Sequence, residues 1–279
     1  MATSLVARLR ASPGRLWRLL KYLVLRTETH AYCGAVAFFA LVGFYPFATL
    51  LLWLARDVLH WRPAETVVLQ TLREYYPEGK DFLLRNLDFT VTARGSSFNP
   101  VTILWVLLGA AGIFIPLETA FNGVWGVKEH RPYWKNQAVG FLLTSTCCGL
   151  AVVFVLATAG LQRLVESQVE GHFEVQLLRY VALHLLALAF SVTVIFAFYK
   201  FLPNTKVPSR RVLRGAILAG VVAEAVRFVY QLSLPYLDLQ GEHGPYYVSV
   251  IFVLLCYFET FVLIGGAYLA AGHEKAEGV

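Results

Sequence analysis

Charged residues are scarce in this sequence. They make up 15% of its 279 residues, against about a quarter in ordinary soluble domains. Hydrophobic residues reach 57%, and the mean hydropathy is +0.58. A chain of this composition buries apolar surface in lipid as well as in a core, so an ordinary soluble domain is excluded. We find no soluble second domain and no low-complexity tract.

Cysteine and histidine are also few, which bears on disulfides and metal sites. The four cysteines all fall inside apolar segments, where we expect buried thiols and no disulfide. The seven histidines are scattered, and no spacing of His, Cys and carboxylate residues resembles a zinc or iron site. We therefore expect no metal and no cofactor. The chain also lacks a P-loop, which excludes an ATP-driven pump formed by this chain alone.

The sequence is rich instead in long apolar stretches. They predict an all-α, polytopic membrane protein with six transmembrane helices. Pro46 and Pro116 stand inside two of these stretches and are expected to kink them. The predicted membrane domain covers residues 31–275, and its spans lie at about 31–55, 101–127, 138–160, 180–201, 213–236 and 246–271. A short charged tail at 272–279 is predicted to be cytoplasmic and overlaps the end of this domain.

Two further segments are predicted to lie outside the membrane core. Residues 1–30 form a basic arm, and between Pro13 and Arg26 leucines fall on one side of a helix and arginines on the other. That pattern predicts an amphipathic helix at the membrane surface. The insertion at 56–99 holds six basic and six acidic residues and no long apolar run. It predicts a small helical cap, with short helices at 63–76 and 80–94.

The distribution of basic residues predicts the orientation of the chain. The two termini and the even-numbered connections hold 15 Lys and Arg residues, against eight in the odd-numbered connections. By the positive-inside rule both termini are cytoplasmic and the cap lies on the opposite side. We expect membrane lipids, including anionic ones, as partners and no nucleic acid. The predicted headgroup contacts lie in the connection 200–214: Lys200, Lys206, Arg210, Arg211 and Arg214.

A few polar residues inside the spans form the candidate functional site. Glu224 and Arg227 lie one turn apart in the middle of the fifth span, where they can meet on one helix face. Small residues at four-residue spacing accompany them and allow close helix packing. Glu118, Asn122 and Glu259 are the other members of this candidate site. Two interpretations remain open: a buried pair that only fixes packing, or a functional polar site inside the membrane.

Several stretches together resemble the YihY/BrkB family of bacterial inner-membrane proteins, sometimes labelled ribonuclease BN. They cover most of the chain and read AYCGAVAFFALVGFYPFATLLL at 31–52, GIFIPLETAFNGVWGVKEHRPYW at 112–134, YKFLPNTKVPSRRVLRGAILAG at 199–220, AEAVRFVYQLSLPY at 223–236 and LLCYFETFVLIGGAYLAA at 254–271. The chain departs from the family pattern at Tyr247-Val248, where the family tends to show Tyr-Gly. It departs again at Tyr268, where the family commonly has Glu.

The resemblance implies an inner-membrane protein of six helices, in a family associated with virulence and envelope properties. With the orientation predicted above, the cap at 56–99 is then periplasmic. It suggests a transporter or flippase of a lipid or other amphiphilic envelope component. The alternative is a non-catalytic scaffold or assembly factor for the envelope. We expect no enzyme and no catalytic residue, because the cytoplasmic connections hold no cluster of carboxylates or histidines for phosphodiester chemistry.

Overall fold

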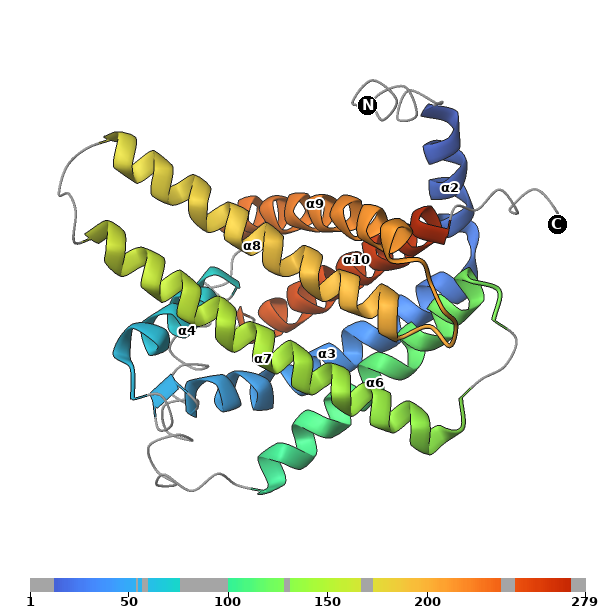
Figure 1. Ribbon diagram of the computed structural model, residues 1–279, viewed down its shortest axis with the longest axis horizontal. Coiled ribbons are helices and arrows are strands. Elements are labelled where there is room, and N and C mark those ends of the chain that lie inside the picture. Colours follow the sequence, from blue (N-terminus) through green and yellow to red (C-terminus); the bar gives the residue numbers. More distant parts are fainter. Residues whose placement is uncertain are drawn as a thin grey trace.

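The fold is a bundle of helices, seen in a computed structural model of the chain (Figure 1). The structure describes residues 13–53, 55–56, 60–75, 100–127, 131–166, 173–236 and 244–271. Within these ranges the regular structure is helical, which confirms the predicted all-α class. The insertion's second predicted helix, at 80–94, and the tail at 272–279 lie outside the described residues.

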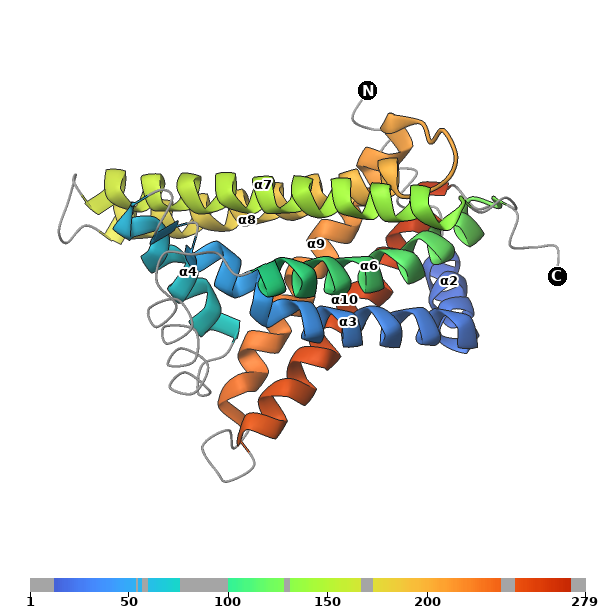
Figure 2. The same ribbon diagram turned by 90° about the horizontal axis from the view of Figure 1, so that it is seen from below.

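Six long helices coincide with the six apolar stretches. They are α3 (Thr27–Trp53), α6 (Pro100–Val124), α7 (Tyr133–Glu166), α8 (Phe173–Phe201), α9 (Ser209–Ser233) and α10 (Gly244–Ala271). Each helix packs against the next in the chain, and α10 returns to pack against α3, so the six close into a ring. In Figure 2 α7 and α8 run side by side, while α9 and α10 cross the molecule obliquely as a pair.

The number of membrane spans that the structure supports is smaller than the number predicted. Three helices among the described residues are long and apolar enough to cross a membrane: Trp134–Leu161, Tyr180–Phe201 and Ser249–Ala271. A fourth span results if Thr27–Phe44 and Phe47–Trp53 count as one. These two pieces meet at an angle of 41° around the stretch that contains Pro46, whereas α6 stays helical through Pro116.

Small residues set how closely the long helices approach. A Cβ added to Gly109 of α6 would lie 2.7 Å from the Cα of Gly43 on α3. Likewise, a Cβ on Gly266 of α10 would lie 2.7 Å from the Cβ of Ala219 on α9 and 2.5 Å from the Tyr199 hydroxyl. These contacts put backbones nearly in van der Waals contact, which is how helices associate tightly in lipid.

Three short helices complete the described fold. The amphipathic helix predicted near the N-terminus is α2 (Pro13–Leu25), which buries Leu23 in the core and exposes Trp17 and Leu25. The first cap helix is α4 (Arg62–Tyr75), which packs between α3 and α7 through Ala64, Val67 and Val68. The last is the short η2 (Leu234–Tyr236), which follows α9.

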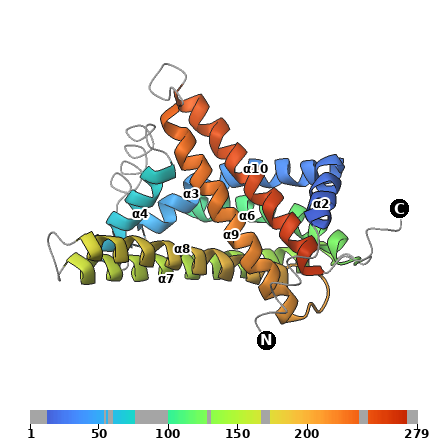
Figure 3. The same ribbon diagram turned by 90° about the horizontal axis from the view of Figure 1, so that it is seen from above.

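The helix ends gather at opposite sides of the molecule. One side holds α2, the end of α6, the start of α7, the α8–α9 connection and the end of α10 (Figures 1 and 2). The other side holds α4, the end of α7 and the start of α8, and Figure 3 shows the far ends of α9 and α10 projecting together away from the α8–α9 connection. We call the first side the basic end, because the α8–α9 connection and Lys135 lie there. The helix ends that flank the even-numbered connections therefore lie together at the basic end.

Candidate functional site

Four side chains from three helices meet in what we call the charge cluster: Ser191 of α8, Glu224 and Arg227 of α9, and Glu259 of α10. Arg227 donates from Nη1 to Glu224 Oε1 at 2.6 Å and to Ser191 Oγ at 2.8 Å. Its Nε donates to Glu259 Oε1 at 2.9 Å, and Nη2 donates to Glu259 Oε2 at 3.5 Å. Ser191 in turn donates to Glu224 Oε1 at 2.8 Å. The guanidinium therefore lies between two carboxylates from different helices.

The local sequence explains why these groups meet. Glu224 and Arg227 are three residues apart and so share a face of α9. The same helix buries a row of small residues, Gly215, Ala219 and Ala223, which lets α10 come close enough for Glu259 to reach Arg227. At 1.5 Å per residue, the four residues of the cluster lie about 15–27 Å along their helices from the basic ends. If these helices cross a bilayer, such distances correspond to the interior of a hydrocarbon core roughly 30 Å thick.

The charge cluster is shielded but not sealed. The side chains of Glu224, Arg227 and Glu259 are 30%, 26% and 20% exposed, whereas Ser191 is buried. The apolar side chains beside them on α9, such as Phe228 and Val229, are mostly exposed. The charged groups of the cluster are therefore partly accessible from outside the bundle.

Glu118 and Asn122 lie elsewhere, in a second polar cluster that we call the loop anchor. Arg131, two residues before α7, donates to the carbonyl oxygens of residues 201–203 and to Asn204 Oδ1. Glu118 Oε1 lies 3.8 Å from Arg131 Nη1, and Asn122 Oδ1 accepts a 2.8 Å hydrogen bond from the Asn204 backbone N–H. The anchor fastens the α8–α9 connection to the end of α6, and we assign it a positioning role.

The predicted site therefore divides in two. The structure brings Glu224, Arg227 and Glu259 together, and it places Glu118 and Asn122 at the basic end of the ring. Ser191, Arg131 and Asn204 were not among the predicted site residues. Ser191 interrupts an apolar run in α8, which was the available signal. Arg131 and Asn204 lie in loops, where polar residues are common and so do not indicate a site.

The five residues predicted to contact lipid headgroups lie at the basic end. Lys206, Arg210, Arg211 and Arg214 are exposed. Lys200 is half-buried, and its Nζ donates to the backbone oxygen of Val207 at 2.7 Å, which caps the α8–α9 connection.

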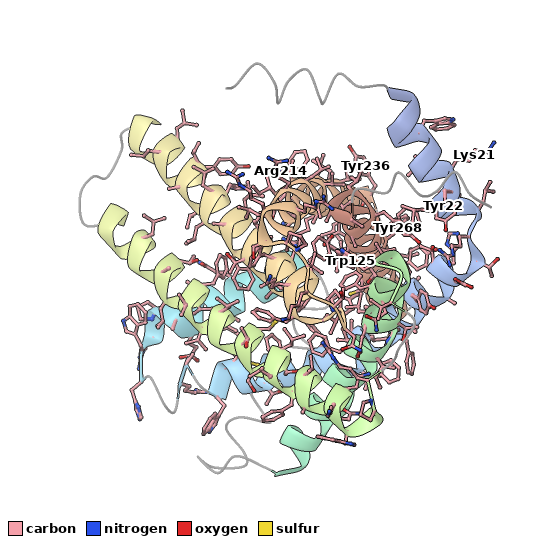
Figure 4. The ribbon with its side chains drawn as sticks, turned by 45° about the vertical axis from the view of Figure 1, so that its right-hand side comes forward. Lys21, Tyr22, Trp125, Arg214, Tyr236 and Tyr268 are labelled. Carbon is pink, nitrogen blue, oxygen red and sulfur yellow. The ribbon has the colours of Figure 1, made fainter. Side chains whose placement is uncertain are left out.

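A third polar group ties the N-terminal arm to the last helix. Arg26 donates to the hydroxyls of Tyr22 and Tyr268 at 2.6 and 2.7 Å and pairs with Glu28. Figure 4 shows Tyr22 and Tyr268 beside one another, and their rings meet edge to face. Tyr268, which departs from the family pattern, thus serves as the partner of Arg26.

The part of the chain that the structure describes holds no candidate metal-binding site. No group of three or more His, Cys, Asp or Glu side chains there is placed to hold an ion.

Comparison with known proteins supplies the family. The model for "Virulence factor BrkB" matches residues 24–278, nearly the whole chain. The protein belongs to the BrkB family. This confirms the resemblance drawn from the sequence motifs, and it makes the protein a multi-pass membrane protein of that family.

Several curated relatives of this BrkB-family chain carry the name "UPF0761 membrane protein". The chain is 26% identical over 267 residues to one from Chromohalobacter salexigens, covering 91% of this chain and 62% of the relative. It is 25% identical over 214 residues to one from Pseudomonas aeruginosa, covering 74% and 49%. It is 21% identical over 260 residues to one from Acinetobacter baylyi, covering 90% and 59%. The chain thus spans about half to three fifths of these relatives' length. No solved structure matches it significantly.

Proposed function

We propose that this BrkB-family protein moves a lipid or another amphiphilic envelope molecule across the bacterial inner membrane. The observation that carries the proposal is the partial exposure of the charge cluster at mid-depth. A charge in hydrocarbon costs about 2.5–3.5 kcal/mol on insertion scales. Charges with only a packing role are therefore expected to be sealed inside the bundle. Here they lie where a polar headgroup could exchange with the cluster while its acyl chains stay in lipid.

The proposal includes six crossings. Besides the three or four helices that meet the length and composition criteria, α6 and α9 have 25 residues each. At 1.5 Å per residue each is about 37 Å long, enough to cross a hydrocarbon core of about 30 Å. On α9 the exposed side chains at mid-depth are largely apolar, as expected for a helix that borders lipid: Ile217, Val221, Val222, Phe228, Val229 and Leu232.

The orientation that we propose has both termini and the basic end in the cytoplasm, with α4 in the periplasm. Four exposed cations at the start of α9 and in the preceding connection support it, because basic residues are retained on the cytoplasmic side. They would also attract anionic headgroups toward the cytoplasmic opening of the path, at about 1 kcal/mol per cation near the surface.

A translocation assay tests the function. The protein is reconstituted into vesicles that contain a trace of fluorescent phosphatidylglycerol, and a membrane-impermeant reductant bleaches only the outer leaflet. Native protein should accelerate bleaching of the inner-leaflet lipid over empty vesicles. The double variant E224Q/R227M should insert and fold but lose this acceleration. Lys135→Gln, at an exposed cation of α7 far from the cluster, is the matched control and should behave like native protein.

The same assay separates transport from the alternative role as a scaffold. If the double variant is folded and moves lipid as fast as native protein, the charge cluster only holds helices together. If native protein moves no lipid with or without a pH gradient, the transport proposal itself is wrong.

We also propose that the protein is not a ribonuclease. Purified protein should leave transfer RNA intact with and without added Mg²⁺ or Zn²⁺, since cleavage needs clustered acid–base groups or metal ligands. RNA cleavage that copurifies with the protein and disappears in a single-residue variant would contradict this.

A further inference from the structure

The charge cluster holds one more carboxylate than it has cations. Arg227 is shared between Glu224 and Glu259, and the third partner, Ser191, is uncharged. With both carboxylates ionised the formal charge is therefore −1. In surroundings of low dielectric a net charge is expensive, so such a cluster tends toward neutrality by binding a proton on one carboxylate.

In the described part of the chain, the hydrogen-bond and ion-pair partners of Glu224 and Glu259 are Arg227 and Ser191, so no second cation pairs with either carboxylate there. On α10 the neighbour one turn before Glu259 is Cys256, and α8 contributes the neutral Ser191. From α3, which packs on α10, His30 contacts the Tyr257 hydroxyl, and its other ring nitrogen contacts the backbone oxygen of Val24. Among the described residues, the charged members of the cluster are thus Arg227 and the two glutamates.

Arg227 is also the natural ligand for an arriving anion. A guanidinium binds phosphate oxygens through paired N–H donors, in the same geometry in which it now binds Glu259. Its partial exposure leaves it within reach from the side of the bundle. A phosphate that takes the place of a carboxylate adds one negative charge and leaves that carboxylate without its cation. The displaced carboxylate then binds a proton from the aqueous phase, because a nearby negative charge and the loss of the guanidinium both favour its neutral form.

We infer that the substrate headgroup is an anionic phosphodiester, and that its binding at Arg227 is coupled to the uptake of about one proton by Glu224 and Glu259. This inference rests on the proposed function and names its substrate class and its coupling ion. By reciprocity, protons should strengthen anion binding by the same factor by which the anion strengthens proton binding. A pH gradient could then drive the headgroup and the proton across the membrane in the same direction.

Calorimetry on native protein in phosphatidylcholine nanodiscs tests the coupling. Dihexanoylphosphatidylglycerol is titrated in at one near-neutral pH, in two buffers with different ionisation enthalpies. Its phosphodiester does not itself titrate there, so the difference in heat reports the protons taken up by the protein. We expect uptake of about one proton per bound lipid. Dihexanoylphosphatidylcholine, with the same phosphodiester neutralised by a quaternary amine, should bind at least tenfold more weakly.

Variants assign the two halves of the inference. Arg227→Gln should weaken phosphatidylglycerol binding by roughly tenfold or more, as expected for loss of a charge-assisted pair. If the Arg227→Gln variant does not fold, Arg227→Lys is measured in its place, because lysine keeps the positive charge but lacks the paired N–H donors of the guanidinium. E224Q/E259Q should still bind the lipid but take up no proton. Glu28→Gln removes an exposed carboxylate that pairs with Arg26, and it should leave both quantities unchanged.

Each outcome bears on a different statement. Binding without proton uptake in native protein would overturn the coupling and leave lipid transport standing. Equal binding in native protein and in both Arg227 variants would overturn the assigned headgroup site. Dimethyl phosphate that binds as tightly as the lipid would show that the ligand is a free anion and not a headgroup. Coupled binding in this experiment, with no lipid movement in the vesicle assay, would retain the site and reject the proposed function.

Discussion

Arg227 is the residue at which three helices are tied together. It is hydrogen-bonded to α8 through Ser191, to its own helix through Glu224 and to α10 through Glu259. Such a group is asymmetric in its energetics. Removing all of its charges together costs little, whereas removing one partner leaves the others uncompensated in a medium of low dielectric.

The first prediction follows from that asymmetry. Arg227→Met alone should lower the free energy of unfolding by about 2–4 kcal/mol, because two carboxylates are left without a cation. E224Q/R227M should recover at least half of this loss, since one carboxylate and Arg227 disappear together. The measurement is thermal or denaturant unfolding in one detergent, with Lys135→Gln as the control. Equal stability of native protein and the Arg227→Met variant would mean that water or lipid headgroups already neutralise the glutamates.

At the scale of the helix, small residues decide which faces pack. Gly109 lies where α6 meets α3, and an added Cβ would come within 2.7 Å of the Gly43 Cα, which is backbone and cannot turn aside. Gly34, on α3 itself, has nothing within 4 Å of the same added atom. The two glycines thus differ in packing although both stand in apolar helices.

The second prediction uses this pair. Gly109→Ala should destabilise the protein by about 1–3 kcal/mol, the usual range for an overpacked contact. Gly34→Ala should be neutral or stabilising by a few tenths of a kcal/mol to about 1 kcal/mol, because alanine is the better helix former. Unfolding midpoints of the two variants in the same detergent provide the comparison. Equal unfolding midpoints would argue that α3 and α6 are not in close contact at Gly43 and Gly109.

At the scale of the whole molecule, the closed ring gathers the ends of several helices, with the α8–α9 connection, at the basic end. The loop anchor and the Arg26–Tyr268 pair hold the basic end together, because they join the α8–α9 connection to α6 and α7 and join α2 to α10. The exposed cations at the start of α9 belong to this end. The sidedness of the protein in the membrane is therefore a property of the whole bundle.

The third prediction concerns that sidedness. Single cysteines replace exposed Thr66 on α4 and exposed Ser209 at the start of α9, in a background without native cysteines. In cells permeable only at the outer membrane, an impermeant thiol reagent should label the Thr66→Cys variant and spare the Ser209→Cys variant. After lysis both should be labelled. Labelling of the Ser209→Cys variant but not the Thr66→Cys variant in the same cells before lysis would invert the proposed topology.

Much of the architecture was determined by local sequence. Apolar stretches longer than about 20 residues must be helical in lipid, because every backbone N–H and C=O needs a partner within the segment. The six helices therefore coincide with the predicted stretches, although their ends differ by several residues at α7 and α8, which extend beyond the apolar run. The i,i+3 contact of Glu224 and Arg227 was predictable for the same reason, since helix geometry alone brings them together.

Contacts between helices were decided only by the tertiary structure. Glu259, Glu118 and Ser191 lie on different helices, and which of them meets Arg227 depends on how the helices rotate and cross. Glu118 carries the same carboxylate as Glu259 and also stands in an apolar stretch, yet it lies beside Arg131, while Glu259 completes the charge cluster. A sequence records which groups are costly in lipid. The packing of backbones at Gly215, Gly266 and their neighbours decides which of these groups share a partner, because the close approach of α9 and α10 brings Arg227 and Glu259 within hydrogen-bonding distance.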